Sequence, residues 1–271
     1  MSWGEVYKIN TDFAEPLNKK IEKSLQQILF RANGNFTVPK TGRYRITAIG
    51  KGGDGGRAES YGSAGHFGCG GGGAGGISQS ILDLTKDAVI AVTVSATVSS
   101  FGAYFTANAG NAGVSGSDLT SNTAGGTGGT ASGGNVFNIT GGTGSSGTGG
   151  NGTHKGGDGA SVGSPTLAGT GGQPGSTTYA GIGGSGFLPF LNPTGVPSGG
   201  QPGNTAGVFG GGTYTAATGT YTVSGGGGGA FGGGGGGGSV YSSGNASAKI
   251  GYGGGGGAGA VLIEYLSPLF V

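Results

Sequence analysis

The sequence has few charges, little proline, one cysteine and no long apolar run, and each shortage excludes a class of protein. Charged residues make up 9% of the chain and the net charge is only +2, so the charge gives no reason to expect nucleic acid binding, which needs a basic stripe. The single cysteine, Cys69, leaves no partner for an internal disulfide. No apolar run reaches the roughly 20 residues that a membrane-spanning helix needs, and we expect no membrane insertion.

Glycine is the residue that dominates, with 75 of the 271 positions. The glycines follow no strict period of three and proline occurs only 9 times, which excludes collagen. A flexible linker would contain glycine and serine without aromatic residues, whereas tyrosine and phenylalanine recur throughout residues 138–260. We therefore expect ordered, extended glycine segments resembling polyproline II, hydrogen-bonded to neighbours in several directions. The alternative is an unstructured tract.

The N-terminal residues predict a short helix. Thr11 and Asp12 are suited to its N-cap. Over residues 17–30, apolar side chains fall on one helical face, and these are Leu17, Ile21, Leu25 and Ile28. Because about four turns are marginal for a lone helix in water, this helix needs a partner surface or copies of itself. No basic region followed by an apolar segment is visible in residues 1–10, so we expect no secretory signal and assembly in a cytoplasm.

The strongest strand signals lie on both sides of the glycine-rich region. Tyr44, Ile46 and Ala48 alternate with polar residues, which is typical of a half-buried strand. The predicted strands are 36–39, 43–50, 77–84, 88–98, 100–107 and 259–266. We expect the C-terminal strand to return and pair with the earlier ones, which would make the glycine region a large insertion in a small β-sandwich.

The predicted fold class is therefore mainly β, with a short N-terminal helix and a small β-sandwich that frames a glycine-rich, polyglycine-II-like insertion. The predicted organisation is a helical segment at 1–33, a sandwich base with a glycine-rich insert at 34–137, a glycine-rich body with loop tips at 138–258, and a closing strand at 259–271.

Residues for catalysis are scarce. The only histidines are His66 and His154; His66 lies near Cys69, but zinc prefers four ligands. A glycosidase needs two carboxylates about 5 to 10 Å apart, and between residues 88 and 248 only Asp118 and Asp158 are acidic. We expect no enzyme activity, no metal and no cofactor.

The order of these segments resembles the glycine-rich domains at the ends of bacteriophage tail-fibre proteins. The resemblance covers about residues 34–266 and depends on the motif 36–39, the strand 44–50, the glycine blocks and the strand 259–265. The opening residues 1–6, with Leu17-Asn18-Lys19, look like the start of tail-associated proteins. The body is similar to the polyglycine-II sandwich adhesins of T-even-like phages, in which variable loops contact the host receptor. The chain departs from these adhesins by its charged N-terminal helix and its framing strands.

The resemblance implies a phage or phage-derived tail-fibre, receptor-binding protein that attaches the particle to the host cell. It implies a location in the tail of the virion and a homotrimer, with residues 1–33 docking to other tail, fibre or baseplate proteins. The attachment or oligomer candidates are Trp3, Tyr7, Leu17, Ile21, Leu25 and Ile28. The predicted helix could instead pack on its own body or on another tail protein.

Aromatic residues of the body are the candidates for receptor contact, because tyrosine offers a large contact area at low entropic cost. The candidates are Tyr179, Phe187, Phe190, Tyr214, Tyr221 and Tyr241. The receptor is expected to be a host surface glycan or an outer-surface protein. Residues 186–193 could instead be a buried plug, and Tyr214 and Tyr221 could merely cap glycine helices. Two functional alternatives are a purely structural tail component and a glycine-rich ice-binding or wall-type protein.

Overall fold

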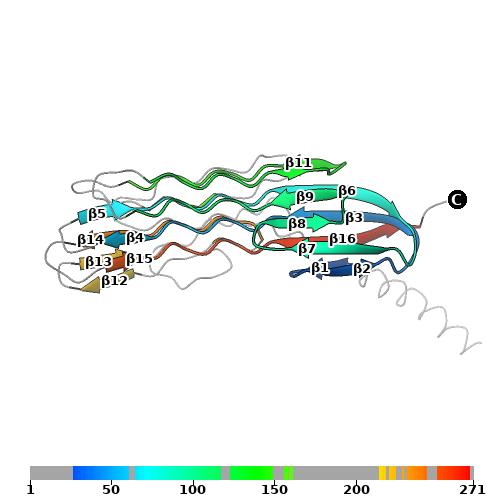
Figure 1. Cartoon of the computed structure of the whole chain (residues 1–271), viewed down its shortest axis with the longest axis horizontal. Coiled ribbons are helices and arrows are strands. Elements are labelled where there is room, and N and C mark those ends of the chain that lie inside the picture. The colour runs from blue at the N-terminus through cyan, green and yellow to red at the C-terminus, as the bar shows by residue number, and fades with distance from the viewer. Residues whose placement is uncertain are drawn as a thin grey trace, which may run out of the picture.

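The computed structural model describes residues 27–60, 65–116, 123–148, 156–157, 159–160, 214–217, 220–223, 228, 231–242 and 249–268. This part of the chain is mainly β: it contains strands and no helix, and its named strands all pair antiparallel. The strands gather at the two ends of an elongated unit, and glycine-rich segments run between them (Figure 1).

Two five-stranded sheets form one end, which we call the base. The first sheet contains, in spatial order, β1 (Gln27–Phe30), β16 (Ala260–Ser267), β3 (Gly42–Ile49), β6 (Ile77–Leu84) and β11 (Phe137–Ile139). The second contains β10 (Ala131–Ser132), β9 (Phe105–Asn108), β8 (Val98–Phe101), β7 (Val89–Val94) and β2 (Gly34–Thr37). The predicted return of the C-terminal strand is confirmed, because β16 pairs with β3.

The core of the base lies between the two sheets. The alternating residues Tyr44, Ile46 and Ala48 of β3 enter it from the first sheet, and Phe101 and Phe105 enter it from the second. Tyr44 packs edge-on against Phe36, with 5.8 Å between ring centroids. Aromatic pairs at such distances and angles add to the stabilisation from buried apolar area. A single apolar core thus joins strands from residues 34 to 263.

The predicted helix over residues 17–30 is wrong in its last turn. Gln27–Phe30 form the edge strand β1, in which Ile28 pairs with Ile263 and Phe30 with Val261. Isoleucine, leucine and phenylalanine fit a half-buried sheet well, and the edge of β16 provides hydrogen-bond partners that an isolated helical turn lacks. Ile28 is 42% exposed and belongs to the base sheet, so it is not part of a helical seam.

Two predicted strands are also shorter than expected. Residues 88–98 and 100–107 contain β7, β8 and β9, which are joined by tight turns. At the second turn Gly102 has φ of 53°, a left-handed conformation that glycine adopts without strain. At the first turn the Ser95 hydroxyl donates to the Val98 carbonyl. Turn residues therefore divide a stretch whose composition favours strand throughout.

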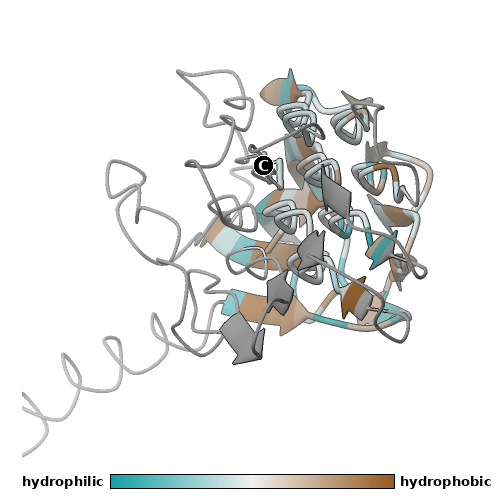
Figure 2. Ribbon diagram, turned by 90° about the vertical axis from the view of Figure 1, so that its left-hand side faces the viewer, coloured by the Kyte–Doolittle hydropathy of each residue, from teal (hydrophilic) through white to brown (hydrophobic). Residues whose placement is uncertain are grey.

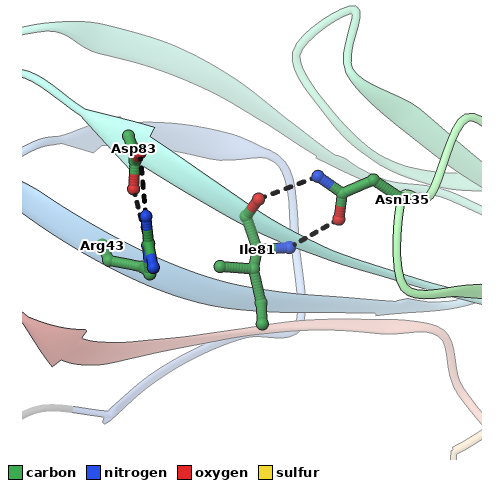
Figure 3. A network of polar contacts seen from close by, with 4 residues as sticks. All are labelled: Arg43, Ile81, Asp83 and Asn135. Carbon is green, nitrogen blue, oxygen red and sulfur yellow. Dashed lines mark hydrogen bonds and ion pairs between the residues drawn. The ribbon is translucent and has the colours of Figure 1, made fainter.

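Two polar contacts on the outer side of the first sheet are structural (Figure 3). Where β11 no longer accompanies β6, the side chain of Asn135 replaces a neighbouring strand. Its amide nitrogen donates to the Ile81 carbonyl and its oxygen accepts from the Ile81 N–H, both at 2.9 Å. On the adjacent strands, Arg43 donates from Nε to Asp83 at 2.9 Å. The Asn135 contacts satisfy backbone groups of β6 that have no strand beside them, and the Arg43–Asp83 pair links β3 to β6.

Glycine-rich segments connect the base to the opposite end, and their hydrogen bonds repeat every third residue. Gly50, Gly53 and Gly56 donate to the segment 70–76, whereas Gly52 and Gly55 donate to the segment 254–257. In a β-strand, by contrast, successive N–H groups alternate between two neighbours. We call these glycine-rich segments together the glycine bundle. Viewed along its length, the bundle consists of separate narrow coils that lie side by side (Figure 2).

The segment 69–76 is the centre of this bundle. Every N–H group from Cys69 to Gly76 donates to a carbonyl of another segment, and the whole segment is buried. Its hydrogen-bond partners belong to five other segments and to the pair Gly157 and Ala160. The five segments are 50–56, 108–114, 126–129, 142–145 and 232–238. Buried backbone groups require such partners, so this segment is held by its backbone.

The far end of the bundle, which we call the distal end, carries a second set of strands (Figure 1). A four-stranded sheet contains β12 (Tyr214–Ala217), β13 (Thr220–Val223), β14 (Ser239–Ser242) and β5 (Gly65–Gly68), in this order. A separate pair consists of β15 (Lys249–Gly251) and β4 (Ala58–Ser60). Two of the predicted receptor-contact residues, Tyr214 and Tyr221, therefore lie in strands.

Candidate functional site

The distal four-stranded sheet brings three of the predicted receptor-contact positions together. Tyr221 pairs with Tyr241, and Tyr214 pairs with Val223. Directly paired residues of antiparallel strands lie on the same face, as do residues two apart in one strand. The positions of Tyr214, Tyr221 and Tyr241 therefore share one face of this sheet.

Most of the remaining predicted residues of the site and of the attachment segment lie outside the described residues. Among the contact candidates, Tyr179, Phe187 and Phe190 lie outside the described residues, as do His154, Asp118 and Asp158. Among the attachment candidates, the same holds for Trp3, Tyr7, Leu17, Ile21 and Leu25. Ile28 is the one attachment candidate that the structure places, in β1 of the base.

One side of the glycine bundle carries a row of charged and aromatic residues, from Lys51 near the base to Glu59 in β4 of the distal end, that the sequence reasoning missed. We call this group the strip, and its members are Lys51, Asp54, Arg57, Glu59 and Tyr252. The guanidinium carbon of Arg57 lies 5.4 Å from the centre of the Tyr252 ring, within the range of a cation–π contact. Arg57 Nη2 also lies 2.7 Å from Glu59 Oε1. The contacts hold the guanidinium between an acid and an aromatic ring.

The other half of the strip is built around Asp54. Its Oδ1 accepts from Lys51 Nζ and from the N–H of Gly256, both at 2.8 Å. Burial of the carboxyl acts to raise the pKa of Asp54, but the hydrogen bonds from Lys51 and Gly256 and the charge of Lys51 outweigh this, so the pKa lies below its usual range. Asp54 is thus an anion tied to the neighbouring glycine segment.

A signal for the strip was present in the sequence. Residues 51–57 read Lys-Gly-Gly-Asp-Gly-Gly-Arg, with a side chain at every third position. A threefold helix puts such positions on one side. This spacing by itself indicates that Lys51, Asp54 and Arg57 form one outward row.

Cys69 is placed where it cannot act as a nucleophile. The residue is buried in the bundle, and the N–H of Gly116 donates to its sulfur at 3.2 Å. Burial raises the pKa of the Cys69 thiol to about 11, against smaller opposing effects of Gly116 and Thr123. The thiolate is the reactive form of cysteine, so the thiol remains protonated and unreactive at neutral pH.

The part of the chain that the structure describes contains neither a cluster of metal ligands nor a membrane-spanning helix. Among its residues, no three or more His, Cys, Asp or Glu residues are grouped so that they could hold a metal ion. None of the described residues forms a helix long and apolar enough to cross a membrane.

Comparisons of the sequence with family models and with curated proteins find no relative of this chain. No protein-family model matches the chain, and a search of curated proteins finds no match.

Proposed function

We propose that the protein is a tail-fibre, receptor-binding protein of a phage or phage-derived particle, and that it attaches the particle to the host cell surface. In this proposal the base is a small β-sandwich, and the glycine segments form a polyglycine-II-like insertion that carries the contact residues away from it. The protein acts by binding and catalyses no reaction.

The observation that carries the proposal is the separation of the two ends by the glycine bundle. β1 and β16, the first and last strands of the described part, are neighbours in the base. The strands β4, β5 and β12 to β15 lie at the opposite end of the unit (Figure 1). An elongated body with its contact face at the far end suits a protein that must bridge from a particle to a cell.

The tyrosine positions of the distal sheet support a binding role for that end. The positions of Tyr214, Tyr221 and Tyr241 share one face of a small sheet, and tyrosine is enriched in protein surfaces that bind partners. Several copies per particle would strengthen a set of individually weak contacts. We propose a homotrimer that docks to other tail proteins through residues 1–33, as the resemblance implies.

The test measures binding of the full chain to a panel of candidate host strains. We expect saturable binding to some strains and a loss of at least tenfold in affinity in the double variant Tyr221→Ala, Tyr241→Ala. The control variant is Tyr104→Ala, because Tyr104 is a half-exposed tyrosine of the base. A well-folded protein that binds no strain, or a double variant that binds as well as the control, would overturn the adhesin proposal in favour of a structural tail component. A mass by light scattering of three chains would support the trimer, and a mass of one chain would contradict it.

A further inference from the structure

We propose that the strip on the side of the bundle is a saccharide-binding site, separate from the face of the distal sheet. The strip would be a second binding site of the protein, with saccharides as its class of ligand. Binding at the strip does not depend on whether the distal sheet binds a receptor.

The strip exists because the glycine bundle directs side chains outward at every third position. At Gly52, Gly53, Gly55 and Gly56, a Cβ atom would lie about 2 Å from the backbone of a neighbouring segment. Only Lys51, Asp54 and Arg57 can carry side chains in this stretch. At about 3.1 Å per residue, such positions repeat every 9 Å or so along the bundle.

The adjacent segment, residues 252–258, also exposes every third residue, and one of its exposed positions is a glycine with free space around it. Tyr252, Gly255 and Ala258 are exposed, whereas a Cβ on Gly253 or Gly256 would lie about 2 Å from a backbone oxygen of the segment 52–55. At Gly255, an added Cβ would meet nothing within 4 Å. The surface beside Tyr252 is therefore formed by exposed backbone at Gly255, and we call this patch of backbone the floor.

Side chains of known position border this floor. Tyr252, 56% exposed, stands three residues away in the same segment, and Arg57 lies over its ring. Asp54 reaches across from the next segment to the N–H of Gly256, directly beside the floor. The floor is thus bordered by an aromatic ring, a guanidinium and a carboxylate, each held by a contact within the protein.

This combination suits a sugar better than a charged polymer. The C–H face of a pyranose packs on an aromatic ring, and its hydroxyls hydrogen-bond to carboxylates and guanidinium groups, which offer several acceptors or donors in one plane. The strip contains two cations, Lys51 and Arg57, and two anions, Asp54 and Glu59, so it has no net formal charge. Nucleic acid binding depends on an excess of positive charge.

A peptide that adds a strand is also disfavoured at this place. Such a peptide needs unpaired backbone groups at a sheet edge. Here the N–H groups of Gly52, Gly55 and Gly256 already donate within the protein, and the Gly255 carbonyl accepts from Gly228. Side chains provide the polar groups available for a ligand, which favours a saccharide that spans two or three sugar units along the strip.

The experiment exposes the full chain to an array of bacterial outer-core, O-chain and capsular oligosaccharides, followed by calorimetry with the oligosaccharide that binds best. We expect Tyr252→Ala and Gly255→Leu each to weaken binding at least tenfold. A Cβ at position 255 meets nothing within 4 Å, so we expect leucine to cover the floor without displacing the bundle, and a urea unfolding curve like that of the parent shows that the variant is folded. Tyr104→Ala is the control for a surface tyrosine and should bind as the parent does.

Three outcomes would overturn the saccharide site. The first is that no oligosaccharide binds, and the second is that Tyr252→Ala and Gly255→Leu bind like the parent. The third is that these variants lose binding to a purified outer-surface protein but to no sugar, which would make the strip a protein-binding site. The double variant Tyr221→Ala, Tyr241→Ala should still bind the oligosaccharide, so failure of the distal face and failure of the strip are distinguishable.

Discussion

A Cβ atom on Gly73 would lie 2.1 Å from the carbonyl oxygen of Thr127 in the neighbouring segment. The N–H of Gly73 meanwhile donates to Asn111, and its carbonyl accepts from Gly53. The residue is therefore surrounded on several sides by backbone, which cannot rotate away as a side chain could. The packing of the bundle depends on the absence of side chains at such positions.

The first prediction compares two glycines of the bundle. Gly73→Ala should lower the free energy of unfolding by about 3 kcal/mol, at the upper end of the range for overpacking, because backbone must move. Gly255→Ala is the matched control. It should leave stability unchanged or raise it by about 0.4 to 1 kcal/mol, since alanine restricts the unfolded chain. Urea unfolding measures both; equal effects would contradict the close packing around Gly73.

The second prediction concerns a buried hydroxyl of the base. Ser99 is fully buried, and its Oγ has no hydrogen-bond partner in the described part of the chain. An unsatisfied buried polar atom costs about 1 to 3 kcal/mol, so Ser99→Ala should raise the free energy of unfolding by about 1 kcal/mol. A clear loss of stability in this variant would show that the hydroxyl has a partner after all.

A double variant extends this prediction. A Cβ on Gly259 would lie 2.7 Å from Ser99 Oγ and 3.1 Å from the Ile49 carbonyl oxygen. Gly259→Ala should therefore be destabilising, and Ser99→Ala should rescue part of the loss, because the shortest of the close contacts disappears. A double-mutant cycle measures this coupling; strictly additive effects would contradict it.

The third prediction is a pH dependence centred on Cys69. Burial raises the pKa of this thiol from 9.0 to about 11 in the folded protein. The folded state thus favours the protonated thiol. Its contribution to stability is complete below pH 9, and is lost as the pH rises toward 11, because the unfolded chain releases the proton first. Cys69→Ala should lack this part of the alkaline loss of stability.

Thiol labelling gives an independent measurement of the same burial. At pH 8 the native protein should react with an aromatic disulfide reagent far more slowly than the protein in 6 M guanidinium. Native labelling as fast as that of the unfolded chain would show that Cys69 is accessible.

The strands of the base were predictable because their side chains alternate. Tyr44, Ile46 and Ala48 indicated β3, and the apolar run at 260–263 indicated β16. β1 was missed because Ile28 fits a helical stripe with Leu17, Ile21 and Leu25 as well as it fits a short strand. Its pairing with β16, which is more than 200 residues away in the chain, decided the outcome.

The neighbours of each glycine segment were not predictable from the sequence. A residue without a side chain leaves no pattern from which to infer neighbours, so the surroundings of segment 69–76 could not be read from its sequence. The strip could have been found, because Lys51, Asp54 and Arg57 have a regular spacing. Tyr252 could not be assigned to it, since the contact with Arg57 joins two segments far apart in the chain.

The three-residue repeat of the hydrogen bonds has a consequence for how the length of this protein can change. One or two residues inserted into segment 69–76 would shift its N–H groups out of step with every surrounding segment, while three would restore the phase. Lengthening the bundle would need the same addition in all segments together. The distance between the base and the distal end can therefore change only in steps of three residues per segment. Variation in sequence and length is then tolerated where segments turn back at the distal end, and resisted along the bundle itself.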